Sequence, residues 1–183
     1  MKKHLLTILL LTIFALNVNA QCNTSQGPDS GSAFVNVAGF NTYPWSQPQN
    51  AQSSDNSYAS VGLSSFGPYS EGLKSTGFGF SIPATASICG IEVNVERSSS
   101  GMVTLQDFQI RIVKNNTVIG TNAASLSLWS TTDAVVTYGS NSNLWGTTWT
   151  PAEINNSSFG AAVSAERPAF WTYASYGLVD QIT

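Results

Sequence analysis

Hydrophobic residues in this chain recur mainly at every second position rather than at every third or fourth. The clearest case is the stretch 88–97, in which Ile91, Val93 and Val95 alternate with polar residues. Successive side chains of a β-strand point to opposite faces, so this pattern predicts a strand with one buried and one solvated face. Because no window shows a sustained helical period, the chain is expected to be built from β-strands.

Other segments show a weaker form of the same signal. They are short, contain β-branched and aromatic residues, and are separated by connections rich in Gly, Pro, Ser and Asn. A turn is expected at the Ser-Ser-Ser-Gly sequence 98–101. Besides 88–97, the predicted strands are 33–37, 58–63, 77–82, 103–114, 117–121, 134–138, 159–165 and a last strand that begins at 179.

Two local features are expected in the hairpin over 103–121. The hydrophobic parity shifts between Leu105 and Phe108, and a β-bulge near Asp107 would absorb that shift. Asn115 and Asn116 follow the first strand directly. Asparagine tolerates positive φ, so this pair predicts a tight hairpin turn.

One segment carries a helical signal. Thr150, Pro151 and Glu153 form a capping box with proline at the first helical position, which predicts a short helical turn near 151–156. Strands at this spacing with turn-rich connections are typical of two packed sheets. The expected fold is therefore all-β: a two-sheet antiparallel β-sandwich, jelly-roll-like, with one short helical turn.

The N-terminus has the pattern of a secretory signal peptide. Lys2 and Lys3 precede a run of about a dozen apolar residues, and Val18-Asn19-Ala20 offers small or modest residues at a cleavage site. The run is shorter than the ~20 residues that cross a bilayer, so membrane insertion is not expected; an uncleaved anchor is the alternative. We expect a signal peptide over 1–20 and a single β-sandwich domain over 21–183, truncated inside its last strand.

Two cysteines remain after the predicted leader. They are Cys22 and Cys89. Their number is even and they do not form a CxxC motif, so in an oxidising compartment one disulfide is favoured over a metal site. Two free thiols are the alternative. The leader and the predicted disulfide together indicate a secreted or cell-surface protein.

Charge and histidine content exclude several function classes. The formal net charge is −3 and charged residues make up 9% of the chain, so the basic surface that nucleic-acid binding requires is missing. His4 is the one histidine and lies in the leader, which excludes a Ser-His-Asp triad and histidine-ligated metals.

A carboxylate pair is the remaining catalytic arrangement. Glu92 and Glu96 share a predicted strand face, about 13 Å apart along the backbone, whereas glycosidases place their carboxyl groups ~5 to ~9.5 Å apart. Carboxylates from distant strands stay an open alternative. We therefore expect no enzyme.

Aromatic residues are dense in the second half of the chain and suit carbohydrate stacking. Trp145 and Trp149 flank the capped turn and are expected to pack in the core. The candidate ligand-binding residues, which lie in more polar or irregular contexts, are Trp129, Trp171 and Tyr173.

No cofactor is expected. Asp107, Asp133 and Asp180 could contribute oxygen ligands to a structural calcium. However, no Asp-x-Asp-x-Asp loop is present, and solvated turn residues are the favoured interpretation.

Part of the chain resembles a recurring extracellular module. Its basis is Ile88–Val93, Asp107–Ile112, the segment 143–160 with its Trp, capped turn and Phe-Gly, and the terminal Val-Asp-Gln-Ile. The resemblance, over about 82–183, is to β-sandwich modules in secreted surface proteins of Bacteroidetes-type bacteria and in phage tail or virion structural proteins. It implies architecture and location but no catalytic site.

Two functions are compatible with these observations. The first is an exported, non-catalytic structural or interaction module of adhesion type, whose partners are other surface proteins or domains of the same polypeptide. The alternative is a carbohydrate-binding module that uses loop tryptophans to hold a polysaccharide.

Overall fold

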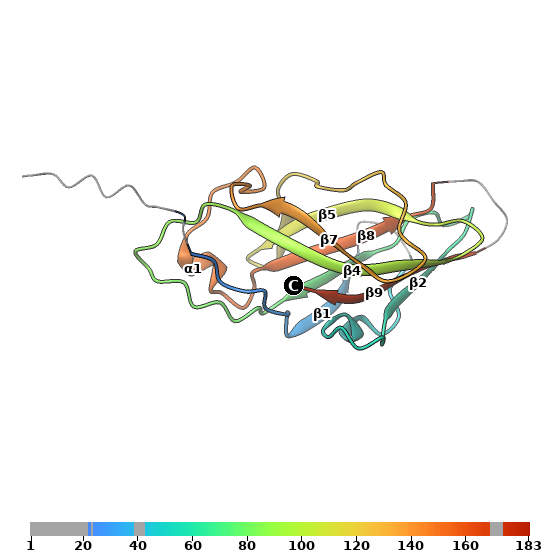
Figure 1. Ribbon diagram of the computed structural model, residues 1–183, viewed down its shortest axis with the longest axis horizontal. Helices are drawn as coiled ribbons and strands as arrows, with labels where there is room; N and C mark the ends of the chain where they lie inside the picture. The colour runs from blue at the N-terminus through green and yellow to red at the C-terminus, as the bar shows by residue number, and fades with distance from the viewer. Residues whose placement is uncertain (1–21, 23, 39–42, 169–173) are drawn as a thin grey trace, which may run out of the picture.

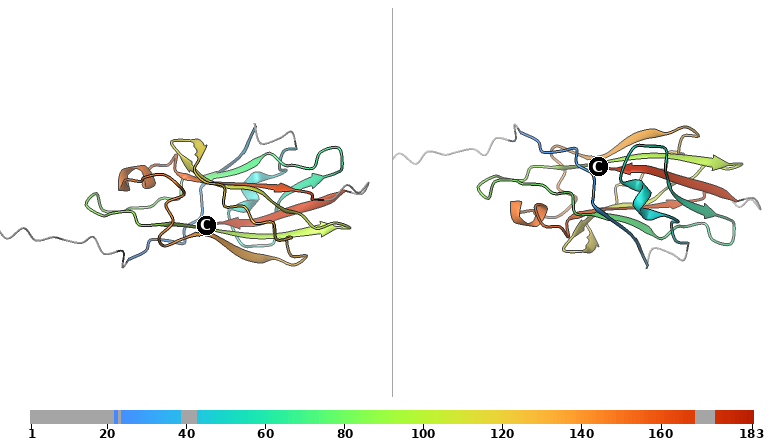
Figure 2. Two further views of the ribbon diagram at one scale, coloured as in Figure 1. Left: turned by 90° about the horizontal axis from the view of Figure 1, so that it is seen from above. Right: turned by 90° about the horizontal axis from the view of Figure 1, so that it is seen from below.

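The protein is a sandwich of two antiparallel sheets (Figures 1 and 2). The computed structural model describes residues 22, 24–38, 43–168 and 174–183. The elements of this part are β1 (Ala33–Val37), η1 (Pro48–Ala51), β2 (Ala59–Leu63), β3 (Gly72–Thr76), β4 (Ile91–Gly101), β5 (Gln106–Lys114), β6 (Thr117–Ile119), β7 (Ala134–Ser140), α1 (Pro151–Ile154), β8 (Gly160–Glu166) and β9 (Ser175–Ile182).

The five-stranded sheet has the order β1-β3-β8-β5-β6, and the four-stranded sheet has the order β2-β9-β4-β7. All strand pairs within the two sheets are antiparallel. The sheets lie face to face as two layers, with the α1 turn at one end of the sandwich (left in Figure 1). The predicted all-β sandwich is confirmed.

The inward faces of both sheets form one hydrophobic core. In β4 the alternation expected from the sequence is present, because Val93 and Val95 are buried while Glu92 is exposed. The central strand β8 is buried along nearly its whole length and consists mostly of small residues. Those small residues leave room for the bulky buried side chains of the neighbouring strands, among them Leu73 of β3 and Ile110 and Ile112 of β5.

Three local predictions are confirmed. The register between β5 and β8 shifts between Asp107 and Gln109, where the bulge was expected. Asn115 and Asn116 adopt positive φ values of 50° and 64° in the hairpin turn. Thr150 caps α1: its side chain accepts from the Glu153 N–H, and the Glu153 side chain accepts from the Thr150 N–H.

The prediction of a strand over 77–82 is wrong. The strand in this region is β3, which ends at Thr76. Gly77 and Gly79 both have φ of +76°, which an extended strand does not allow. The alternation that suggested a strand instead places two aromatic rings, Phe78 and Phe80, against Phe159 at centroid distances of 6.2 and 6.0 Å.

The predicted turn at 98–101 is also wrong, because β4 continues to Gly101. Ser98, Ser99 and Ser100 pair with Leu178, Gly177 and Tyr176 of β9. The strand β9 accordingly begins at Ser175 rather than at 179. Serine and glycine favour turns locally, but a long partner strand supplies backbone hydrogen bonds that outweigh this preference.

The predicted disulfide joins Cys22 to Cys89 with a Cα–Cα distance of 6.1 Å. The predicted leader, residues 1–20, lies outside the described residues. Among the helices of the described ranges, none has the length and apolarity needed to cross a membrane.

Candidate functional site

A pocket lies at the end of the sandwich where β8 ends and β5 begins. Its volume is about 280 Å³, close to the size range of small-molecule sites. The described residues that line it combine an aromatic ring, an amide, a carboxylate, a guanidinium and two prolines. They are Ser65, Pro68, Tyr69, Gln106, Glu166, Arg167 and Pro168.

Strand pairing aligns three of these side chains across the end of the five-stranded sheet. Glu166 is the last residue of β8 and is paired on one side with Tyr69 and on the other with Gln106. Cross-strand partners project to the same face of a sheet, so the phenol, carboxylate and carboxamide form a row. The Gln106 Nε2 donates a hydrogen bond to Glu166 Oε1, which fixes both groups.

The segment before β3 is firmly attached at this point. The Arg167 N–H donates to the Pro68 carbonyl at 2.7 Å, and the Ser70 N–H donates to the Ala165 carbonyl at 2.9 Å. The Tyr69 ring also packs against Phe108 with ring centroids 4.5 Å apart. Tyr69 is therefore held in place by backbone hydrogen bonds and by the Phe108 ring. Its side chain is half-buried and lines the pocket.

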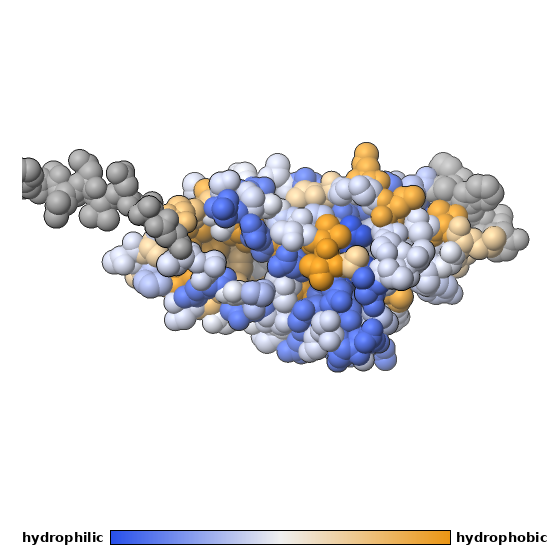
Figure 3. Space-filling model, in the orientation of Figure 1, coloured by the Kyte–Doolittle hydropathy of each residue, from blue (hydrophilic) through white to orange (hydrophobic). Residues whose placement is uncertain are grey.

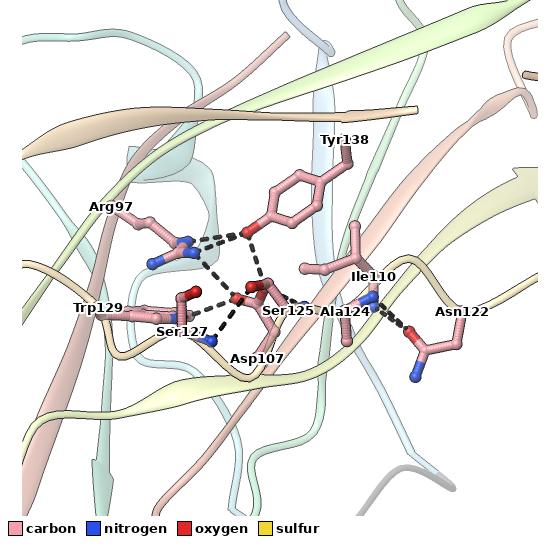
Figure 4. Close-up of polar contacts among 9 residues, drawn as sticks. All are labelled: Arg97, Asp107, Ile110, Asn122, Ala124, Ser125, Ser127, Trp129 and Tyr138. Atoms are coloured by element: carbon pink, nitrogen blue, oxygen red, sulfur yellow. Dashed lines mark hydrogen bonds and ion pairs between the residues drawn. The ribbon is translucent and has the colours of Figure 1, made fainter. Parts of the chain in front are cut away.

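A second polar arrangement lies in the core beneath the bulge of β5 (Figure 4). The Asp107 carboxylate accepts hydrogen bonds from Trp129 Nε1 at 2.8 Å and from the Tyr138 hydroxyl at 2.9 Å, and pairs with Arg97 at 3.3 Å. The Arg97 and Asp107 side chains are 3% and 0% exposed. A buried ion pair surrounded by hydrogen-bond donors is a structural device here, since both charged side chains are almost completely shielded from solvent.

Burial and the Asp107 charge raise the pKa of Tyr138 well above its ordinary value. The phenol therefore stays protonated and donates to Asp107, while it accepts from Arg97 Nε and from the second guanidinium nitrogen at 3.0 and 2.8 Å. Each charged group in this network is satisfied, as a buried ion pair requires.

The expectation that Trp129 is an exposed ligand-binding residue does not agree with the structure. Its side chain is 1% exposed, and its ring is covered by the Arg97 guanidinium at 4.6 Å from the ring centroid. The polar loop around it suggested exposure, but the indole N–H finds a buried carboxylate in Asp107. Trp171 and Tyr173, the other two candidates, lie outside the described residues.

Trp145 and Trp149 pack in the core, as expected. They are 1% and 8% exposed, and their indole N–H groups donate to the carbonyls of Ile91 and Leu144. Trp149 packs edge-on against Phe159 at a centroid distance of 5.4 Å. Both rings connect the α1 region to the sandwich and are not available to a ligand.

The three aspartates considered for calcium have partners within the protein. Asp107 faces Arg97, and Asp180 accepts from the backbone N–H groups of Asp55 and Asn56 at 3.3 and 3.1 Å. Asp133 accepts from the hydroxyls of Tyr58 and Ser98, both at 2.6 Å. Within the described ranges, no group of three or more His, Cys, Asp or Glu residues is arranged to hold a metal ion.

The hydrogen bond to Asp133 raises the pKa of Tyr58 to about 12, and the nearby charges of Asp133, Asp180 and Glu96 act in the same direction. Below that pH the Tyr58 hydroxyl keeps its proton and holds Asp133 in place. The Asp133 carboxylate is therefore held by two neutral hydroxyl donors, those of Tyr58 and Ser98.

The pocket residues Tyr69, Gln106 and Glu166 were not singled out from the sequence. They lie on three segments separated by 37 and 60 residues, and only the order of strands in the sheet brings them together. The local signal available was weak: Pro68 directly precedes Tyr69, and Pro168 follows Glu166 by two positions.

Comparison with known proteins adds little to this description. No protein-family model matches the chain, and no curated protein matches it in sequence. Among solved structures, the chain is similar to one titled "CBM4 structure and function", with 10% sequence identity and a TM-score of 0.40, over 71% of this chain and 84% of that one. A likeness this distant carries no argument about ligand or family, and the resemblance to bacterial surface and phage modules stays a prediction.

Proposed function

We propose that this chain is an exported, non-catalytic binding module that holds a carbohydrate in the pocket at the end of β8. The observation that carries the proposal is the row of Tyr69, Glu166 and Gln106 along a pocket of about 280 Å³. Under this proposal carbohydrate binding, the alternative from the sequence, is preferred to a purely structural role, and it uses a different site from the tryptophans expected.

The chemistry of this row suits a sugar ring. A pyranose presents an apolar C–H face and a rim of hydroxyls. A tyrosine ring can pack against the C–H face. At the rim, a carboxamide can donate and accept hydrogen bonds, and a carboxylate can accept them. The pocket volume is sufficient for about one sugar unit, so we expect it to take one residue of a glycan or a chain end.

The same pocket is poorly equipped for hydrolysis. Glu166 is the one acidic residue among the described residues that line it, whereas glycosidases use two carboxyl groups. The chain also lacks a histidine outside the leader, so a histidine-based nucleophile system is missing. Binding without turnover is therefore the function proposed.

Trp171 and Tyr173 remain candidate ligand-binding residues. They follow Pro168, which lines the pocket, by three and five positions in the sequence. Export rests on the predicted signal peptide and gains support from the Cys22–Cys89 disulfide, because such bonds persist in oxidising compartments. The adhesion-type reading stays a second candidate, supported by the exposed apolar residues Leu126, Leu128 and Val135.

Affinity electrophoresis of the mature protein through gels that contain a panel of polysaccharides tests the proposal. We expect retardation by at least one polysaccharide and a loss of about tenfold or more in affinity for Tyr69→Ala, since truncating a central aromatic contact costs about 2 kcal/mol or more and about 1.4 kcal/mol is tenfold. The matched control is Tyr176→Ala, which removes a half-exposed tyrosine from the other sheet and should leave retardation unchanged. Equal losses in both variants, or no retardation by any polysaccharide, would contradict the proposal.

A further inference from the structure

A tight turn between β2 and β3 carries an almost fully exposed phenylalanine. Ser64 and Gly67 exchange two backbone hydrogen bonds of 3.2 Å, so Ser65 and Phe66 form the tip of the turn. This turn lies at the end of the sandwich opposite α1, where β2 ends (right in Figure 1). Phe66 is 94% exposed, so its ring is open to solvent instead of packing against the sandwich.

The turn is held firmly on both sides. A Cβ atom at Gly67 would lie 1.6 Å from Cε2 of Tyr43, so the Tyr43 ring packs directly against this glycine and leaves no room for a side chain. On the other side, the Pro68 carbonyl accepts a hydrogen bond from the Arg167 N–H at 2.7 Å. A ring presented on a fixed turn loses little conformational freedom when it binds, which favours affinity.

Exposure by itself does not indicate a binding role. Figure 3 shows apolar residues scattered among polar ones on the face that it presents, which is ordinary for a protein surface. Phe66 differs in its position, because Ser65 and Pro68 on either side of it both line the pocket. Its Cα lies ~3.8 Å from that of Ser65, so the exposed ring stands at the rim of the pocket.

The surroundings of the ring decide what fits on it. Residues 56–70 include no charged residue and the chain has a net charge of −3, whereas membrane-binding surfaces combine apolar side chains with basic ones. Protein interfaces rely on clusters of anchoring residues, but the turn offers only serine and glycine beside Phe66. A single flat ring is sufficient for the C–H face of a sugar. Since the pocket of about 280 Å³ has room for about one sugar unit, the next unit of a glycan must lie outside it, at the rim.

We propose that Phe66 packs against the sugar unit next to the one in the pocket, so that the protein recognises at least two consecutive units of a glycan. The unit in the pocket contacts Tyr69, Glu166 and Gln106, and the following unit lies over the turn 64–67. This inference rests on the proposed function and extends it from a single sugar unit to an oligosaccharide. Phe66 adds affinity without hydrogen bonds, so the second position is expected to tolerate different hydroxyl configurations.

NMR chemical-shift titration of the mature protein with sugars of increasing length tests the proposal. The probes are the monosaccharide, disaccharide and trisaccharide released from each polysaccharide that retards the wild type in electrophoresis; for xylan these are xylose, xylobiose and xylotriose. We expect wild-type affinity to rise about threefold to tenfold from monosaccharide to disaccharide, the range that one stacking contact supports. Phe66→Ala should abolish this rise and leave the monosaccharide affinity within about twofold of the wild type.

Three further variants separate stacking from other effects. Phe66→Trp keeps a flat ring and should retain the rise, whereas Phe66→Leu keeps an apolar side chain without a flat ring and should lose most of it. Val135→Ala is the matched control, since Val135 is a 62% exposed apolar residue on the other sheet, and it should leave both affinities unchanged. Tyr69→Ala, which acts in the pocket, should instead lower the affinity for every probe.

The outcomes distinguish this inference from the proposed function. If the wild type binds no saccharide, the proposed function is wrong and the role of Phe66 falls with it. If the monosaccharide binds but the rise is absent, or survives in Phe66→Ala, only the role of Phe66 is overturned. An equal loss for monosaccharide and disaccharide in Phe66→Ala would also overturn it, as would co-sedimentation with phosphatidylcholine vesicles that depends on Phe66.

Discussion

At the scale of single residues, the Asp107 network shows how a β-bulge places a charge in the core. The register shift between Asp107 and Gln109 turns the carboxylate inward, where it meets Arg97, Trp129 and Tyr138. A buried ion pair adds little net stability when it is complete, but removal of one partner leaves an uncompensated charge in the core. Removing a single member of the network should therefore lower the stability of the fold more than the complete network raises it.

We predict that Asp107→Asn lowers the free energy of unfolding by about 3–5 kcal/mol, because Arg97 stays charged and buried without its counterion. Urea denaturation followed by tryptophan fluorescence measures the change. Lys114→Gln is the control, since the pair of Lys114 with Glu153 is partly exposed and its loss should cost about 1 kcal/mol or less. Replacing both partners with apolar residues, as in Arg97→Met with Asp107→Leu, should recover part of the loss; no recovery would contradict this account.

At the scale of elements, the turns are set by local sequence, whereas the ends of the strands are set by pairing with distant strands. The α1 turn begins where its capping box predicts, and the Asn115-Asn116 turn has the expected positive φ values. The strand ends were decided by partners instead, as in β4, which continues through a Ser-rich segment because β9 pairs with it. Turn chemistry is a local property, whereas strand length depends on what lies beside it.

We predict that Thr150→Ala costs about 1 kcal/mol of stability, because the Glu153 N–H loses the hydroxyl that caps it. Thr148→Ala, at an exposed position two residues earlier, should change stability by about 0.5 kcal/mol or less. Hydrogen bonds from Lys114 and from the Thr150 N–H lower the pKa of Glu153. The contribution of its carboxylate is therefore present above the ordinary pKa and is lost as the pH falls through the lowered one. Because the Thr150 N–H remains in Thr150→Ala, the cost of that substitution should change little with pH, whereas the cost of Glu153→Gln should shrink in acid.

At the scale of the whole molecule, the disulfide and the Gln26 side chain attach the N-terminal segment to the sandwich. Cys22 bonds to Cys89, while the Gln26 amide both donates to and accepts from the Ser81 backbone, at 3.0 and 2.9 Å. These contacts bridge separations of 67 and 55 residues. The disulfide persists in the unfolded chain, where it closes a long loop and so restricts the unfolded chain more than the folded one.

We predict that the disulfide contributes about 4 kcal/mol in the chain-entropy model. The comparison is the urea midpoint of the mature protein against that of the Cys22→Ser, Cys89→Ser double variant, with the wild type under reducing conditions as a check on the variant. The oxidised protein should also show no reactive thiol with a thiol reagent under denaturing conditions. An unchanged midpoint would mean that the Gln26 contacts and the core alone hold this segment.

The sequence by itself determined the fold class, the bulge, the hairpin turn, the capped helical turn and the disulfide partners. Each depends on residues that are close in the chain, on the two-residue period of a strand, or on a cysteine count that permits one pairing. Tertiary structure alone decided that Trp129 is buried, that Tyr69, Glu166 and Gln106 share one pocket, and that β7 is an edge strand of its sheet. Those features depend on which strands lie side by side. Strand order is set by contacts between residues far apart in the sequence, and a local sequence pattern does not contain that information.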